Sequence, residues 1–112
     1  MLLHQSFLKG RRFKMLQHYI TLKFKEGTPE AHRDEFCRRM LALQESIDEV
    51  KEIQIGRDIV NEARSWHLLI KLVVADIDSL KRYQAHPEHQ ALIAFNGPYV
   101  DVIGVVDFNN FI

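Results

Sequence analysis

The stretch from Trp66 to Val74 constrains the fold of this chain more than any other part of the sequence. Its residues alternate between two sets that would lie on opposite faces of a strand, and both sets are largely apolar. One set is Trp66, Leu68, Ile70, Leu72 and Val74, and the other is His67, Leu69, Lys71 and Val73. A strand with one solvated face would carry polar residues on that face, so this pattern predicts a central strand that is covered on both sides.

Alternation and helical spacing in the other segments predict the remaining elements. Thr28 and Pro29 provide a start signal for an amphipathic helix, with Thr28 as its cap and Pro29 at its first position. The expected elements are a strand over residues 18–25, a helix over 29–47, a strand over 50–57, a helix from Asp76 or Asp78 through Tyr83 that restarts at His86-Pro87, and a strand over 99–108. The order β α β β α β predicts an α+β, ferredoxin-like fold, in which two helices cover one face of an antiparallel sheet.

This arrangement leaves the second face of the sheet without a cover in a single copy of the chain. Leu69, Val73 and alternate residues of 100–106 would place apolar side chains on that face. Exposed apolar patches of this kind mark interfaces. We therefore expect a homodimer in which the two sheets face each other.

Length and charge narrow the class of protein. The 112 residues are enough for one domain and one core, and 15 basic residues balance 15 acidic ones. A chain without net charge has no overall field to hold a phosphate backbone, so nucleic acid is not an expected partner. The longest apolar run is also far shorter than the roughly 20 residues of a membrane helix, so no membrane association is expected.

The first fourteen residues differ from the rest because they contain basic residues and no acidic one. We expect residues 1–14 to be a flexible basic leader, or a targeting segment, and residues 15–112 to be the folded domain. Cys37 is the single cysteine, which excludes an intrachain disulfide and allows a reducing compartment. The cytoplasm is the expected location.

Three segments of the chain together resemble one known family. Residues 83–89, with the sequence YQAHPEH, are followed by the strand VIGVVDF over 102–108, and residues 18–25 read HYITLKFK. The combination resembles the stress-responsive dimeric α/β-barrel (Dabb) family, which includes plant polyketide cyclases. The resemblance implies a ferredoxin-like monomer and a dimeric barrel with the helices outside.

The same resemblance implies that His89 is a general base and that Tyr83 assists it, if the protein is an enzyme. An imidazole can remove an acidified proton beside a carbonyl at neutral pH, and a phenol can hydrogen-bond the resulting enolate. The alternative is structural: His86 would cap the helix restarted by Pro87, while Tyr83 and His89 would tie the two helical pieces together.

A cavity between the sheet and the helices is the expected binding site. The resemblance and the helical spacing give His18, Phe36, Met40, Leu68 and His86 as its lining, although the same spacing is also typical of a plain core. The cyclases carry a further pocket histidine where this chain has Leu68. His67 is expected on the opposite, barrel-facing side of the sheet.

No metal or cofactor is expected. His86 and His89 are three residues apart, but two imidazoles without a third ligand rarely form a metal site. The leading hypothesis is a small dimeric protein that binds an apolar or aromatic molecule without an established reaction. The alternatives are an enzyme, either a polyketide-cyclase-like catalyst of intramolecular aldol condensation or a cofactor-independent monooxygenase-like one, and a purely structural stress protein.

Overall fold

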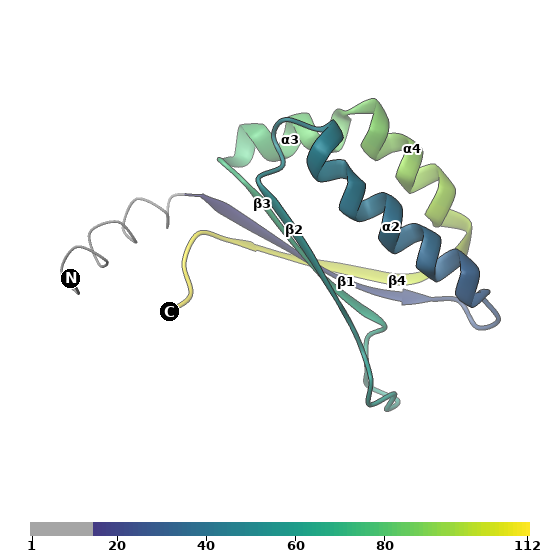
Figure 1. Ribbon diagram of the computed structural model, residues 1–112. Helices are drawn as coiled ribbons and strands as arrows, with labels where there is room; N and C mark the ends of the chain where they lie inside the picture. Colours follow the sequence, from purple (N-terminus) through teal and green to yellow (C-terminus); the bar gives the residue numbers. More distant parts are fainter. Residues whose placement is uncertain (1–14) are drawn as a thin grey trace.

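The computed structural model describes residues 15–112, and the expected leader, residues 1–14, lies outside them. Residues 15–112 form four strands, three α-helices and one 3-10 turn, with the helices gathered on one side of the sheet (Figure 1). The elements are β1 (Leu16–Phe24), α2 (Glu30–Ser46), β2 (Glu52–Arg57), β3 (Leu68–Val74), α3 (Ile77–Ala85), α4 (Pro87–Asn96), η1 (Gly97–Tyr99) and β4 (Val100–Phe108).

The four strands form one antiparallel sheet in the order β2-β3-β1-β4. β3 lies between β2 and β1, so the expected central strand is confirmed as an interior one. This order, with helices on one face, is the ferredoxin-like βαββαβ fold that the sequence predicts. Within residues 15–112 no helix is long and apolar enough to cross a membrane.

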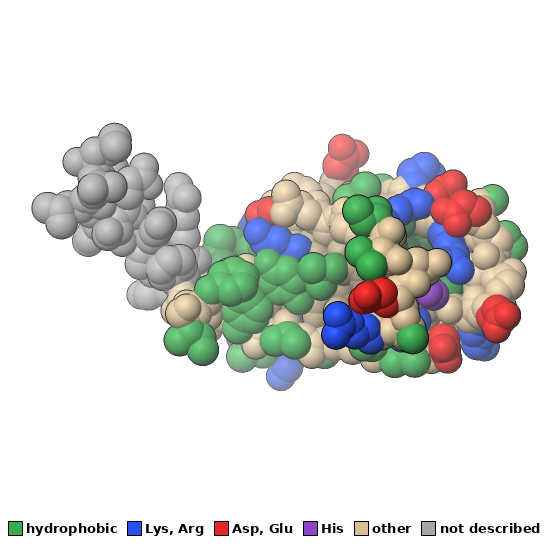
Figure 2. Space-filling model, turned by 90° about the horizontal axis from the view of Figure 1, so that it is seen from below, with side chains coloured by type: hydrophobic (Ala, Val, Ile, Leu, Met, Phe, Trp, Pro, Cys, Tyr) green, Lys and Arg blue, Asp and Glu red, His purple; other side chains and the backbone are tan. Residues whose placement is uncertain are grey.

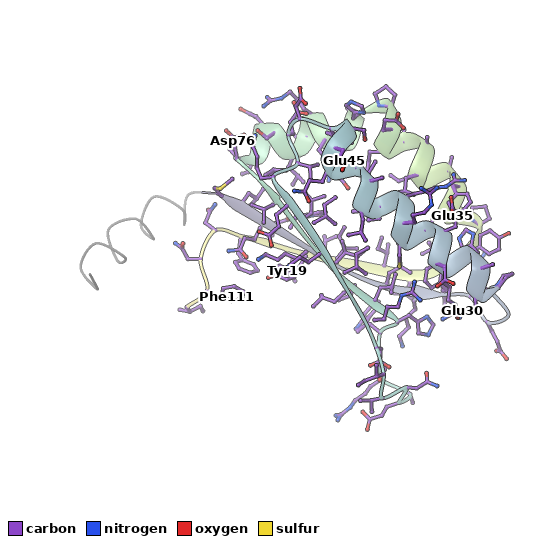
Figure 3. All side chains as sticks on the ribbon, viewed as in Figure 1. Tyr19, Glu30, Glu35, Glu45, Asp76 and Phe111 are labelled. Carbon is purple, nitrogen blue, oxygen red and sulfur yellow. The ribbon has the colours of Figure 1, made fainter. Side chains whose placement is uncertain are left out.

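The core lies between the sheet and the helices. Every second residue of β1 is buried there, because the strand turns those side chains toward α2 and α4. The buried members of β1 are Leu16, His18, Ile20, Leu22 and Phe24. Helix α2 contributes Phe36, Met40 and Leu43 to the same core at helical spacing, and its exposed side carries Glu45 (Figure 3).

The start of α2 differs from the expectation. The helix begins one residue later than predicted, and Pro29 rather than Thr28 occupies the capping position, with no side-chain cap. The Thr28 hydroxyl donates instead to the Lys25 carbonyl oxygen at 2.6 Å. Its side chain is therefore used in the turn that follows β1.

The third strand is shorter than its sequence pattern predicts, and this reverses the expected face of His67. Regular pairing begins at Leu68, and His67 Nδ1 accepts a hydrogen bond from the backbone N–H of Phe24 at 2.9 Å. The His67 ring stacks on Phe24, which belongs to the core face. The prediction that His67 faces the barrel side is therefore wrong, because strand alternation does not extend into the loop before Leu68.

The face of the sheet away from the helices remains partly open. Figure 2 shows hydrophobic side chains gathered on this face, and Figure 3 shows Tyr19 and Phe111 on the same side. Leu69 is 47% exposed and Val106 is 62% exposed there. We call the residues of this surface the open-face patch: Tyr19, Thr21, Leu69, Val106, Phe108 and Phe111.

Candidate active site

An apolar cavity of about 360 Å³ lies between the sheet and the helices. A volume of this order is sufficient for a small organic ligand. Its polar side chains are those of Tyr83, His89 and Asn96. The apolar lining residues are Ile20, Leu22, Phe36, Met40, Ile70, Leu92, Ile93, Val100 and Ile103, and Gly97 completes the wall.

The break between α3 and α4 positions the two residues of the expected catalytic pair. Tyr83 lies in the last turns of α3, and His86 caps α4 by accepting a hydrogen bond from the Glu88 N–H at 3.1 Å. Pro87 occupies the first turn of α4, where its missing N–H has no cost. This places the His89 ring 4.4 Å from the Tyr83 ring, centroid to centroid.

The imidazole of His89 is held in one tautomer. Its Nδ1 lies 3.0 Å from the Gln84 carbonyl oxygen, and a carbonyl oxygen only accepts, so Nδ1 carries the proton. Burial lowers the pKa of His89 and the nearby His18 acts in the same direction, while the hydrogen bond to Gln84 opposes them. A neutral imidazole with an unprotonated Nε2 is the form that accepts a proton.

The Tyr83 hydroxyl is the second reactive group of the cavity. Tyr83 is only 1% exposed, and its oxygen has no hydrogen-bond partner among residues 15–112. Burial raises the pKa of this phenol well above its usual value, so the group stays protonated and acts as a donor. A buried hydroxyl without a partner costs free energy, which makes it a candidate for contact with a ligand.

The structure divides the other expected lining residues into two groups. Phe36 and Met40 lie in the cavity wall, whereas His18, Leu68 and His86 do not. His18 is buried in the core face of β1 and its Nδ1 lies 2.5 Å from the Asp107 carboxylate on β4. His86 caps α4, and Leu68 packs in the core at the first position of β3.

Asn96 is the polar lining residue of the cavity that the sequence analysis does not predict. Its position seven residues after His89 could have indicated it, because residues i and i+7 lie on one face of a helix.

Cys37 and metal coordination do not add to the site. Burial raises the pKa of the Cys37 thiol, which keeps it in the unreactive protonated form. Among residues 15–112, no three His, Cys, Asp or Glu side chains are grouped in a way that could hold a metal ion.

Comparisons with known proteins agree with this architecture. The chain is 26% identical to olivetolic acid cyclase from Cannabis sativa over 76 residues, which cover 66% of this chain and 75% of the cyclase. The solved structure of a hydroxynitrile lyase from Passiflora edulis matches with a TM-score of 0.79 at 15% identity, covering 88% of this chain and 94% of the lyase. A dimeric ferredoxin-like protein of unknown function from Thermobifida fusca matches with a TM-score of 0.76 at 20% identity, covering 86% and 91% of the two chains.

The two structural likenesses are likenesses of fold. Membership of a family is decided by the stress responsive A/B barrel domain (Dabb) model, which matches residues 16–110, nearly the whole described chain. The protein therefore belongs to the stress-responsive A/B barrel (Dabb) family.

Proposed function

We propose that this protein binds a small, largely apolar carbonyl compound in the cavity and removes a proton from the carbon beside its carbonyl group. The observation that carries the proposal is the pairing, in one apolar cavity, of an imidazole with an unprotonated Nε2 and a phenol hydroxyl that has no partner among residues 15–112. His89 is the base, and Tyr83 is the donor to the oxygen that becomes negatively charged.

The proton transfer follows from the states of these two groups. His89 Nε2 takes the proton from carbon, and the electron pair of the broken C–H bond moves into the carbonyl to give an enolate. The Tyr83 hydroxyl donates to the enolate oxygen, an interaction that is stronger in the charged state than in the neutral ketone. The enolate carbon then attacks a second carbonyl of the same molecule, and the alkoxide that forms takes the proton from the His89 imidazolium; alternatively, the enolate itself takes that proton back. Loss of water from the aldol product completes a condensation.

Family relationship supports ring closure as the second step. A relative of this chain is named as a cyclase, and addition of an enolate to a carbonyl in the same molecule closes a ring. Intramolecular aldol condensation is therefore the reaction class that we assign to the site. A monooxygenase-like reaction has no comparable support in the geometry.

Hydrogen–deuterium exchange at carbon tests the first step without knowledge of the natural substrate. We expect the protein to accelerate exchange of the protons beside the carbonyl of an aryl ketone such as propiophenone in D₂O, followed by NMR. His89→Asn keeps a donor toward Gln84 but removes the base, so the acceleration should fall by about 10² to 10⁴. Tyr83→Phe removes a single hydrogen bond and should lower the rate by about tenfold to a hundredfold.

A matched control comes from the same motif. His86→Asn retains a good helix cap and lies outside the cavity wall, so it should leave the exchange rate unchanged. Absence of exchange above the buffer rate in the wild-type protein, across a panel of aryl and alkyl ketones, would contradict proton abstraction.

The assembly that we propose is a homodimer through the open-face patch. The patch is apolar and exposed, and the ferredoxin-like protein from Thermobifida fusca is described as dimeric. Pairing two copies of one sheet face would remove these side chains from water. A cytoplasmic location remains a prediction from the single cysteine.

A further inference from the structure

Asn96 and His89 both line the cavity, and they lie about two turns apart on α4. Both residues belong to α4, and a separation of seven positions places them on the same helix face, about 10 Å apart along the axis. The wall between them on α4 is made by Leu92 and Ile93, which are apolar. The cavity wall therefore carries polar side chains at two positions about two turns apart along α4.

A buried histidine fixes the orientation of the Asn96 amide. His32 Nε2 lies 2.8 Å from Asn96 Oδ1, and both residues are buried. The His32 ring lies 4.6 Å from the Phe95 ring and 3.8 Å from the Tyr99 ring, centroid to centroid, which holds its plane in place. Because an amide oxygen only accepts, Nε2 donates to it, and the Asn96 Nδ2 group is left as the free donor.

The Nδ2 group donates to no other described residue, although Asn96 lines the cavity. An oxygen of a bound molecule would give this donor the partner that it lacks among residues 15–112. The described lining contains no Lys, Arg, Asp or Glu side chain. The site therefore favours a neutral oxygen over a carboxylate, whose charge would be buried without a counter-ion.

We propose that Asn96, oriented by His32, is a specificity-determining residue that donates an N–H to a neutral carbonyl or hydroxyl oxygen at the far end of the ligand. The substrate class is thus an elongated, uncharged molecule with two oxygen functions about 10 Å apart, one at Asn96 and one at the Tyr83–His89 end. This inference rests on the proposed function, because it assigns the second contact of the same ligand.

A pair of probes with one difference tests the role of Asn96. Benzylacetone carries an aromatic ring at one end and a ketone toward the other, and butylbenzene has nearly the same shape without the oxygen. Affinities are measured by calorimetry in the Tyr83→Phe background, where Asn96 is the remaining side-chain donor in the described cavity wall. We expect benzylacetone to bind about three- to tenfold more tightly than butylbenzene, as one net hydrogen bond predicts.

Adding Asn96→Leu, which is close in volume and has no donor, should abolish that preference and leave butylbenzene binding equal or stronger. This variant also leaves the His32 donor without a partner and lowers stability. A second measurement therefore uses protein that retains Asn96. In its NMR spectrum, the side-chain amide resonances of Asn96 should shift with benzylacetone and not with butylbenzene.

The outcomes separate this inference from the function on which it rests. If both probes bind equally, or if the preference for the ketone survives Asn96→Leu, Asn96 does not select oxygen, while binding in the cavity stands. If neither probe binds, the binding part of the proposed function fails and the inference fails with it. Unchanged Asn96 amide resonances in the presence of saturating benzylacetone also overturn the inference.

Discussion

The two faces of the same sheet have opposite properties in this protein. On the helix side, all five alternating residues of β1 are buried, and Leu72 of β3 is fully buried at 0% exposure. On the other side, the intervening residues of β1 are half-buried and Leu69 of β3 is exposed. Both faces are rich in apolar residues, so composition alone does not distinguish them.

The difference lies in what covers each face. The helix face is closed by α2, α3 and α4 of the same chain, and it encloses the cavity with Tyr83, His89 and Asn96. The open-face patch has no cover within residues 15–112. We infer that the helix face determines folding stability and chemistry, whereas the open face determines association.

The largest expected effect is the loss of a core side chain on the helix face. Leu72→Ala removes buried methyl groups and leaves a cavity, so the free energy of unfolding should fall by about 2 to 5 kcal/mol, measured by urea denaturation. Leu41→Ala is the matched control, because Leu41 is 46% exposed on α2 and its loss should cost under about 1 kcal/mol. Equal losses for the two variants would show that the helix face is not the stabilising one.

The sequence predicts this asymmetry because strand alternation and helix spacing are local patterns. The order of elements, the restart of the helix at His86-Pro87 and the interior position of β3 all follow from signals within a few residues. The same locality explains the error at His67, since the position of its ring depends on a hydrogen bond from the backbone N–H of Phe24, which lies 43 residues away.

Asn96 in the cavity wall shows a second limit of prediction from sequence, which concerns contacts between distant parts of the chain. Asn96 is oriented by His32, which lies 64 residues earlier, and its amide has a defined direction only because the fold brings α2 and α4 together. His18 meets Asp107 across the β1–β4 ladder in the same way. Such pairs depend on tertiary contacts that periodicity does not encode.

The second prediction is that a charge on the open-face patch weakens the dimer. Val106→Lys places a charge on the open-face patch, and two-fold symmetry would place two such charges in one interface. We expect the dimer dissociation constant to rise at least about tenfold, close to 1.4 kcal/mol, by light scattering with size exclusion. Ile59→Lys is the control: Ile59 is an exposed loop residue outside the patch, and it should leave the dimer intact.

A monomeric wild-type protein at micromolar concentration would contradict the association role of the open face. An intact dimer in the Val106→Lys variant would instead locate the interface elsewhere.

The third prediction compares two tyrosines, one in the cavity and one on the open face. Tyr83→Phe removes a buried hydroxyl that has no partner among the described residues, so the free energy of unfolding should rise by about 1 kcal/mol. Tyr19→Phe keeps the stacking on Phe108 and should change stability by less than about 0.5 kcal/mol. A gain in stability together with slower proton exchange in Tyr83→Phe would identify a group retained for function. A loss of stability would instead favour the structural role of this motif.

The smallest expected effect is a pH dependence of stability that arises on the helix side of the sheet. Burial lowers the pKa of both His89 and His67 below the usual value of about 6.5. Between the folded and unfolded pKa values, the unfolded state binds more protons than the folded state. The stability that the two neutral histidines contribute is therefore present in full above about pH 6.5. It is lost as the pH falls through their pKa values in the folded protein.

The carboxylates with lowered pKa values change the free energy of unfolding at lower pH than the histidines do, so the two effects can be separated. Hydrogen bonds from Arg38 and Arg39 lower the pKa of Glu35 to about 2, so its contribution to stability is lost only below about pH 4.5.

Urea denaturation at several values between about pH 5 and pH 7.5 should thus show stability rising with pH. His89→Asn should reduce that slope by less than one proton, which is under about 1.4 kcal/mol per pH unit. The base proposed here must be neutral in the folded protein, and only a lowered pKa produces this slope. An unchanged slope in His89→Asn would therefore show that burial does not lower the pKa of His89 in the folded protein.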